Sequence, residues 1–266
     1  MKIVRFIDAS GKEHCGELVG ERSARVLMDD VVSHSRISDD TVAIERLLAP
    51  IVPRTILCIG LNYKEHAEET GAPIPEHPVV FIKSANTLNS TDAPIVLPRV
   101  EPIEVDYEGE LAVVIGKAAK NVSRATALDY VLGYTCGNDV SGRSWQKKKG
   151  GGQWCRGKSF DSFCPLGPSL VTPDEILDPN NLSISTTVNE QVMQSSNTAD
   201  MIFDVRELIR FLSEGTTLLP GTVIMTGTPP GVGFARKPPV FLKAGDEVTV
   251  EIEKIGRLTN LVQAES

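Results

Sequence analysis

The stretch EVDYEGELAVVIG, residues 104–116, constrains the fold of this chain more than any other segment. Its second half, Leu111–Ile115, is apolar and rich in β-branched residues, which predicts a buried strand. Its first half carries an acid at every second position: Glu104, Asp106, Glu108 and Glu110. Alternate side chains of an extended chain point to one face, about 6.5–7 Å apart. Four carboxylates on one face repel one another, so the pattern predicts a cationic partner.

A divalent metal ion is one candidate for that partner. Asp139 follows the strand-like segment VLGYTCGN, residues 131–138. Two carboxylates of this strand, spaced i, i+2, could join Asp139 in an all-oxygen site of the kind that Mg²⁺ or Mn²⁺ prefers. A solvated strand face, or an edge strand protected by charge, is the alternative explanation of the same pattern. The apolar run that follows favours the metal, because it places the later acids near the interior.

The bulk composition narrows the class of protein. The chain has 266 residues, 41% of them hydrophobic and 23% charged, so it can bury a sizeable core as one large domain or as a main domain with a small appendage. The formal net charge of −8 argues against a nucleic-acid surface, since such surfaces are usually basic. No run approaches the about 20 apolar residues of a membrane span, and the start, MKIVRFIDAS, lacks the long apolar stretch of a secretory signal.

The cysteines indicate the compartment. There are five, an odd number, and none forms a CxxC pair, which is typical of free thiols in a reducing environment. We therefore expect a cytoplasmic protein, or one of the mitochondrial matrix from which a presequence has been removed.

Two prolines, Pro50 and Pro53, mark a domain boundary near residue 51. Residues 1–50 are predicted to form a small N-terminal α+β domain. It would contain strands in KIVRF and ARVLM and a helix over Thr41–Leu48. Residues 51–266 would form the main, catalytic domain.

The main domain shows more strands than helices, which predicts a β-rich α+β fold. The predicted strands are Thr55–Gly60, Pro78–Lys83, Ala93–Pro98, Leu111–Ile115, Val131–Thr135, Ser169–Val171, Leu182–Val188, Thr222–Thr226 and Glu247–Ile252. A short helix is predicted after Asn62, which would cap it in a capping box with Glu65, and Gly71 would stop it. Further helices are predicted over Arg124–Tyr130 and Phe203–Ser213.

Two residues of the first helix could form a catalytic pair. His66 and Glu69 are spaced i, i+3, so the carboxylate can orient the imidazole as a general base or as part of a water-activating pair. A mostly polar, exposed helix is the alternative. The remaining histidines, His14, His34 and His77, lack such neighbours in the sequence.

Three further polar residues are candidates for the same site. Lys158, in RGKSFDSFCPLGP, could bind a carboxylate or polarise a carbonyl, although surface lysines are commoner. Arg143 and Gln146 follow Asp139 at plus four and plus seven. They would share a face if that stretch is helical, and would either flank the metal or stay solvated.

The loop TGTPPGVG, residues 226–233, could expose backbone N–H groups to an anion. Neither GxxxxGK[ST] nor GxGxxG followed by a helix occurs, so ATP and NAD are poorly supported. A cysteine nucleophile, Cys155 or Cys136 with His66, has no local signature in its favour.

Six blocks, in order and at their spacing, resemble the fumarylacetoacetate hydrolase superfamily over about residues 54–262. The blocks are GLNYKEHAEE, PVVFIKSANT, EVDYEGELAVVIGK, GYTCGNDVSGRSWQ, GKSFDSFCPLGPSLV and GTPPGVG. Within it, QSSNT at 194–198 and FARKPPVFLKAGDEV at 234–248 resemble the branch of fumarylacetoacetate hydrolase domain-containing protein 2. That branch is associated with oxaloacetate keto–enol tautomerisation.

The resemblance implies a mixed β-roll catalytic domain that usually dimerises, behind the small N-terminal domain. It implies Mg²⁺, with Mn²⁺ or Ca²⁺ as substitutes. The implied metal ligands are Glu108, Glu110 and Asp139. It further implies a His66–Glu69 pair on a lid that orders over the substrate. Lys158, Gln146 and Thr228 would contact the substrate or its activated water.

Two departures from the family pattern concern this site. The common S-A-R-D-x-x-Q block reads SGRSWQ here, so Ser144 replaces the usual acid and Gly142 could loosen the turn. The founding hydrolase also has a further aspartate ligand upstream, for which no equivalent stands out, so three protein ligands are expected.

The expected activity follows from the resemblance. A metal acting as a Lewis acid can stabilise the enolate of a 2-oxo acid, and Lys158 would hold the distal carboxylate or polarise the carbonyl. We expect a Mg²⁺-dependent enzyme acting on 2-oxo dicarboxylic acids, with oxaloacetate tautomerisation as the first candidate. Arg143 is an additional candidate for anion binding.

Several alternatives stay open. Acylpyruvate or fumarylpyruvate C–C hydrolysis and oxaloacetate decarboxylation are alternatives within the enzyme class. A catalytically silent scaffold is the alternative outside it. The expected partner is a small-molecule substrate, with no nucleic acid or membrane, and the expected assembly is a homodimer.

Overall fold

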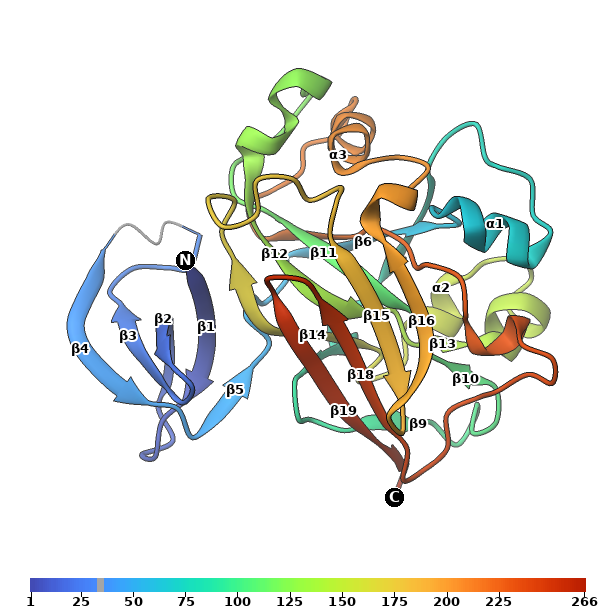
Figure 1. Cartoon of the computed structure of the whole chain (residues 1–266), viewed down its shortest axis with the longest axis horizontal. Helices are drawn as coiled ribbons and strands as arrows, with labels where there is room; N and C mark the ends of the chain where they lie inside the picture. The colour runs from blue at the N-terminus through green and yellow to red at the C-terminus, as the bar shows by residue number, and fades with distance from the viewer. Residues whose placement is uncertain (33–35) are drawn as a thin grey trace.

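A computed structural model describes residues 1–32 and 36–266 of the chain, so His34 lies outside the described residues. The first strands form one end of the large sheet, at one side of the molecule and drawn in blue in Figure 1. They are β1 (Lys2–Ile7), β2 (Glu13–Gly20), β3 (Ser23–Leu27), β4 (Ile37–Ala43) and β5 (Arg46–Leu48). Strand β1 pairs with β14 (Cys164–Val171), which joins this sheet to the rest of the molecule.

The helix predicted over Thr41–Leu48 is wrong. That segment forms the end of β4 and all of β5, which pair with β3 and β1. Ile44 is buried in a small core with Val4, Phe6 and Ala24. The pairing with β3 and β1 determines the conformation of this segment, and it overrides the helical spacing of the apolar residues.

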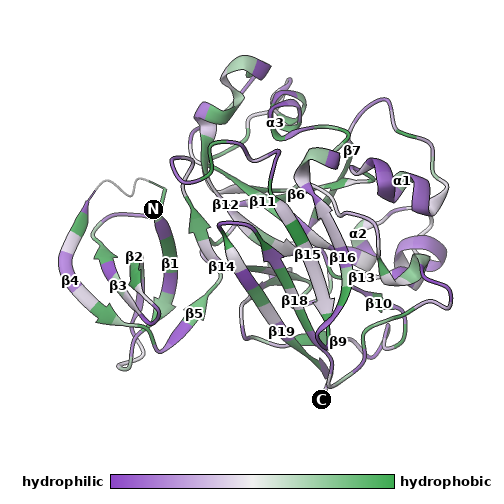
Figure 2. Ribbon diagram, in the orientation of Figure 1, coloured by the Kyte–Doolittle hydropathy of each residue, from purple (hydrophilic) through white to green (hydrophobic). Residues whose placement is uncertain are grey.

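The large sheet runs through the centre of the molecule in the order β4-β3-β2-β1-β14-β12-β11-β17-β6-β7. Its inner members include β12 (Val131–Asn138), β11 (Gly109–Ile115), β17 (Thr222–Met225) and β6 (Thr55–Gly60), and β7 (Val79–Lys83) ends it. Strand β8 (Leu88–Ser90) pairs with β14. Every residue of β11, β12 and β17 is buried, whereas helix α1 at the edge of the molecule is largely hydrophilic in Figure 2. The predicted strands of this sheet are confirmed.

A second sheet packs against the first. Its order is β16-β15-β18-β19-β9, from β16 (Gln191–Asn197), β15 (Ser183–Val188), β18 (Glu247–Ile252), β19 (Gly256–Ala264) and β9 (Ile95–Leu97). Leu111 and Val113 of β11 share one core cluster with Ile184 and Val250 of the second sheet. A two-stranded sheet of β10 (Val105–Asp106) and β13 (Ser141–Gly142) completes the strands that shape the site. The β-rich α+β architecture is confirmed.

The helices are short and lie around the sheets. They are α1 (Lys64–Thr70), α2 (Cys155–Lys158) and α3 (Val205–Ser213), with 3₁₀ segments at Ala85–Thr87, Arg124–Tyr130, Thr198–Asp200 and Gly233–Ala235 and a π-helical turn at Trp145–Lys149. Gly71 ends α1 with φ 65°, as predicted. No helix among the described residues is long and apolar enough to span a membrane.

The capping box predicted for α1 is wrong. Tyr63 occupies the N-cap position and no side chain caps the helix. Asn62 instead donates from Nδ2 to the carbonyl oxygens of Thr226 (2.7 Å) and Phe203 (3.0 Å). Its amide therefore links the start of α1 to the loop after β17.

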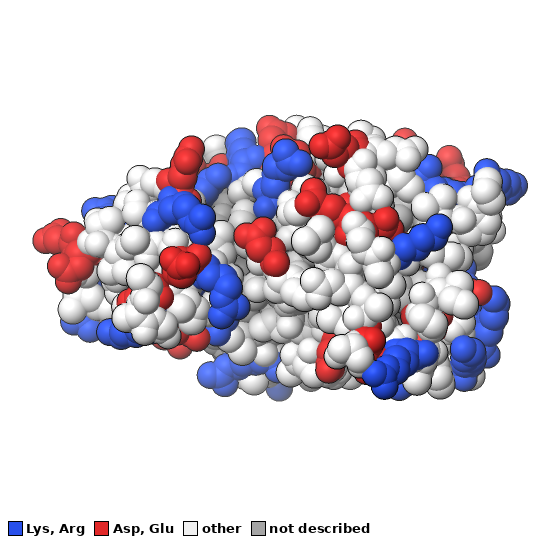
Figure 3. Space-filling view, turned by 90° about the horizontal axis from the view of Figure 1, so that it is seen from below, with Lys and Arg blue, Asp and Glu red and all other residues white. Residues whose placement is uncertain are grey.

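Charges on the surface are mixed. On the face shown in Figure 3, Lys and Arg side chains alternate with Asp and Glu over both sides of the molecule. That face carries no extended basic patch of the kind that binds nucleic acid.

Candidate functional site

Three buried acids meet where β11 begins and β12 ends. Antiparallel pairing of Gly109 with Asn138 places Glu108 beside Asp139, whose N–H donates to the Glu108 carbonyl oxygen at 2.8 Å. Glu108, Glu110 and Asp139 each present a carboxylate oxygen within 4.8 Å of the others. Their exposed fractions are 7%, 1% and 0%. The structure thus brings together the three acids that the sequence proposes as metal ligands.

The four alternating acids do not share one face. The chain leaves β10 after Asp106 and enters β11 at Gly109, so the run is split between two sheets. Asp106 is fully buried and accepts from Arg143 Nε at 2.8 Å and from three backbone N–H groups, of Tyr107, Gly233 and Phe234. Glu104 is paired with Lys148 Nζ at 3.1 Å near the surface.

Two buried lysines hold the acid cluster. Lys158 Nζ lies 2.8 Å from Glu108 Oε2 and 2.5 Å from Asp139 Oδ2. Lys83 Nζ lies 2.5 Å from Asp139 Oδ1. Burial alone would lower the pKa of Lys158, but the adjacent carboxylates of Asp139 and Glu108 outweigh it and the pKa is raised.

Sequence reasoning missed Lys83. It lies at the end of β7, in the apolar segment PVVFIK, and is 3% exposed. A lysine that closes an apolar strand was the available signal, because a buried ammonium needs an acidic partner.

The acids of the cluster differ in their charge balance. Burial would raise the pKa of Glu108, but the cations Lys158 and Arg143 lower it well below its usual range. The pKa of Glu110 is raised well above its usual range by burial and by the neighbouring carboxylates of Asp139 and Glu108. Its carboxylate accepts one bond from the backbone, from Gly227 N–H at 2.8 Å. Among the residues that the structure describes, Glu110 is thus the acid of the cluster without a cation in ion-pair contact.

His66 and Glu69 of α1 are in contact. His66 Nδ1 lies 3.1 Å from Glu69 Oε2, and Glu69 Oε1 accepts from Gly231 N–H at 2.9 Å. His66 is 7% exposed and lines the same pocket as Glu108. Two other histidines are elsewhere: His14 contacts Asp8 at 2.7 Å, a partner that its sequence neighbours did not suggest, and His77 stacks on Phe211.

Arg143 and Gln146 are joined to each other and to the acids. Arg143 Nη2 lies 2.6 Å from Glu108 Oε1, and Nη1 donates to Gln146 Oε1 at 2.9 Å. Thr228 Oγ1 donates to the Gly109 carbonyl oxygen at 3.0 Å and accepts from Gln194 Nε2 at 2.8 Å. Arg143, Gln146 and Thr228 all line the pocket.

The departures at Gly142 and Ser144 have a common explanation. Ser144 Oγ donates to Glu101, which is 3% exposed, so a carboxylate reaches this position from another segment. A Cβ at position 142 would lie 2.9 Å from the Glu101 side chain. Gly142 therefore makes room for Glu101 within the paired strand β13.

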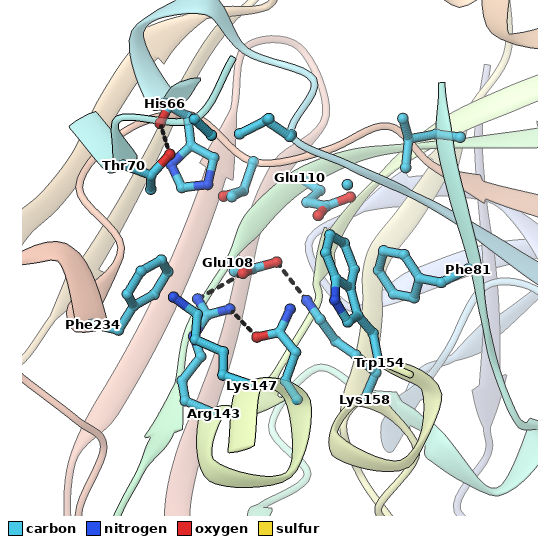
Figure 4. A pocket seen from close by; sticks show the side chains of 16 residues that line it. His66, Thr70, Phe81, Glu108, Glu110, Arg143, Lys147, Trp154, Lys158 and Phe234 are labelled. Atoms are coloured by element: carbon cyan, nitrogen blue, oxygen red, sulfur yellow. Dashed lines mark hydrogen bonds and ion pairs between the residues drawn. The ribbon is translucent and has the colours of Figure 1, made fainter. Parts of the chain in front are cut away.

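One cavity of about 290 Å³, shown in Figure 4, is lined by seven of these residues: His66, Glu108, Glu110, Arg143, Gln146, Lys158 and Thr228. His66 and Thr70 of α1 lie on one side, and Lys158 and Trp154 lie across from them. The interior end carries the acids, and Phe234 and Lys147 lie beside Arg143. A small molecule in this cavity could lie with one end at the acids, with the His66 imidazole over it. Lys158, Arg143 and Lys147 would be near enough to contact it.

Comparisons with known proteins agree on the family. The model of the fumarylacetoacetate (FAA) hydrolase C-terminal family matches residues 55–263. The chain is 51% identical over 86% of its length to a fumarylacetoacetate hydrolase domain-containing protein 2 homolog of Dictyostelium discoideum, covering 78% of that protein. It is also 51% identical to the oxaloacetate tautomerase fahd2, mitochondrial, of Xenopus laevis, covering 87% of this chain and 70% of that one.

A solved structure is similar to this chain over its whole length. The crystal structure of 5-carboxymethyl-2-hydroxymuconate delta-isomerase from Mycobacterium smegmatis superposes with a TM-score of 0.87 at 37% identity, over the whole of both chains. With a family model that covers most of its length and relatives at half identity, this chain belongs to the fumarylacetoacetate hydrolase family.

Proposed function

We propose that this protein is a Mg²⁺-dependent tautomerase that interconverts the enol and keto forms of oxaloacetate. The observation that carries the proposal is a buried three-carboxylate cluster, of which Glu108 and Glu110 line a pocket, and a His–Glu pair whose His66 lines the same pocket. The relatives named oxaloacetate tautomerase, at about half identity, support this choice of reaction.

Glu108, Glu110 and Asp139 would hold the metal. Their carboxylate oxygens are the hard donors that Mg²⁺ takes, and Mn²⁺ or Ca²⁺ could substitute. The raised pKa of Glu110 fits this role, because a carboxylate crowded by two others is stabilised in its charged form by a cation. When bound, the metal supplies Lewis-acid polarisation of the carboxylate and 2-oxo oxygens of the substrate.

His66 would move the proton. Its Nδ1 faces Glu69, so Nε2 is the nitrogen that can exchange a proton with the substrate. Glu69 is itself fixed by Gly231 N–H and would hold the ring in orientation. Enol-to-keto conversion needs one proton delivered to carbon and one removed from oxygen, which a single imidazole can relay.

Lys158 and Gln146 would bind the reacting end of the substrate. Lys158 is 1% exposed and contacts two of the three acids, so its ammonium can polarise a carbonyl placed beside the cluster. Gln146 and Thr228 line the pocket and would orient the same group. Arg143 balances Glu108 and Asp106 and so keeps the cluster charged.

The direct test follows the decay of enol-oxaloacetate absorbance with purified protein. We expect acceleration with Mg²⁺ that is lost on chelation. An unchanged decay rate with Mg²⁺ would overturn the proposal. Pyruvate release from oxaloacetate or an acylpyruvate would instead support decarboxylation or C–C hydrolysis, an alternative that the hydrolase family membership favours. Retention of both the acids and the His–Glu pair argues against a silent scaffold.

The assembly and location are also proposals. We expect a homodimer, because β7 is an end strand of the large sheet and exposes Val80 and Ile82 at 42% and 52%. Light scattering of the purified protein tests this. All five cysteines are free, which suits the cytoplasm or the mitochondrial matrix, and the vertebrate relatives carry mitochondrial in their names.

A further inference from the structure

A third cation of the pocket, Lys147, takes no part in the chemistry described above. Lys147 follows Gln146 in the π-helical turn Trp145–Lys149 and lines the pocket with His66. Its Nζ lies over the ring of Phe234, 3.2 Å from the centroid. A cation–π contact with Phe234 therefore holds the Lys147 ammonium in place (Figure 4).

The other cations of the pocket are already committed. Lys158 is paired with Glu108 and Asp139, and Arg143 with Asp106 and Glu108. Within residues 1–32 and 36–266, no carboxylate oxygen lies within ion-pair distance of Lys147 Nζ. Lys147 is thus the ammonium of the pocket that is available to an incoming anion.

The electrostatic surroundings of Lys147 also call for an anion. Arg143 also lies over the Phe234 ring, 4.4 Å from the centroid, so two cations share one aromatic ring. Burial and the like charge of Arg143 lower the pKa of Lys147 to about 8. A carboxylate that contacts Lys147 would relieve this repulsion, since Arg143 already has two acidic partners and Lys147 has none.

We propose that Lys147, held by Phe234, binds the distal carboxylate of the substrate and selects dicarboxylates over monocarboxylates. This rests on the proposed function, which places the 2-oxo acid end of the substrate at the acid cluster. From the sequence, Lys158 is a candidate to bind the distal carboxylate. In the structure its ammonium is paired with Glu108 and Asp139, at the end of the pocket that carries the acids. Lys147 is partly exposed, on a short turn, and can reach the far end of a bound molecule.

The test compares two ligands that do not react. L-malate and L-lactate share the 2-hydroxy acid end, and L-malate alone has a distal carboxylate. With Mg²⁺ present, binding is followed by tryptophan fluorescence, since Trp154 lines the pocket, or by calorimetry. The variants are Lys147→Met, Lys147→Arg and, as matched control, Lys149→Met, which removes a neighbouring lysine that lies over the Trp145 ring.

We expect the Lys147→Met variant to bind L-malate about tenfold more weakly, the loss typical of one charged hydrogen bond, with L-lactate affinity changed less than about twofold. Lys147→Arg should retain most of the preference for L-malate, and Lys149→Met all of it. The proposal is overturned if the wild type binds L-malate no more tightly than L-lactate, if Lys147→Met weakens both ligands equally, or if Lys149→Met has the same effect. Because this is a binding measurement, a failed tautomerase assay would leave it intact, and the reverse also holds.

Discussion

The two ends of the pocket are built in different ways. The interior end stands on β11 and β12, whose register places three acids together, and buried lysines hold them. The outer end stands on α1, the turn Trp145–Lys149 and the segment Gly233–Ala235, where contacts are aromatic or involve exposed side chains. This contrast suggests that strand pairing fixes the common chemistry, while short connecting segments decide which substrate is accepted.

The largest effect should come from the interior end. Glu110→Ala removes the acid that has no cationic partner, and we expect it to abolish tight Mg²⁺ binding and to lower kcat/KM about 1000-fold, about 4 kcal/mol of transition-state stabilisation. Metal content after dialysis and the enol decay rate measure the two effects. The matched control is Glu104→Ala, since Glu104 pairs with Lys148 near the surface. Equal metal content in the Glu110→Ala and Glu104→Ala variants would contradict the assignment of Glu110 as a metal ligand.

Lys83→Met tests whether the interior end is held by its buried ion pairs. Asp139 would keep Lys158 but lose a partner at 2.5 Å in a fully buried place, so we expect about 3 kcal/mol lower free energy of unfolding. Urea denaturation of the metal-free protein measures it. Lys148→Met breaks a surface pair and should change stability by less than about 1 kcal/mol. Similar losses in the two variants would contradict a distinct role for the buried pair.

The same contrast explains what sequence could predict. Glu108 and Glu110, and likewise His66 and Glu69, are close in sequence, so their spacing alone could predict that each pair lies together. Lys83 was missed because its partner, Asp139, is 56 residues away. A local pattern carries no information on such a contact.

The errors have the same origin. Asn62 looked like a helix cap, but its amide is used by the Thr226 and Phe203 carbonyls, more than 100 residues along the chain. Thr41–Leu48 looked helical, but its partners β3 and β1 make it a pair of strands. Residue type and spacing thus predicted the β-rich fold and its acids, and tertiary partners decided the rest.

His66→Gln tests where the two ends meet. We expect kcat/KM to fall about 100-fold, the usual contribution of a general acid–base, while bound Mg²⁺ stays unchanged because His66 is not among the acids of the cluster. Glu69→Gln should cost less, about tenfold, because the ring would lose its orienting charge but keep its position. His77→Gln is the control, since His77 stacks on Phe211 and does not line the pocket. Loss of metal in His66→Gln would show that the two ends are not independent.

The smallest effect should be a pH dependence confined to the outer end. The groups that act on Lys147 are Arg143 and Lys148, which disfavour its charge, and Glu108 and Asp106, which favour it; with burial, the result is a pKa of about 8. The charged form binds the distal carboxylate, so the preference for L-malate over L-lactate should be full below that pKa and fall as the pH rises through it. Lys147→Arg should keep the preference at higher pH, because a guanidinium stays protonated there. A wild-type preference that is flat up to about pH 10, near the ordinary lysine pKa, would mean that Lys147 does not feel Arg143 and that the outer end is as well balanced in charge as the inner one.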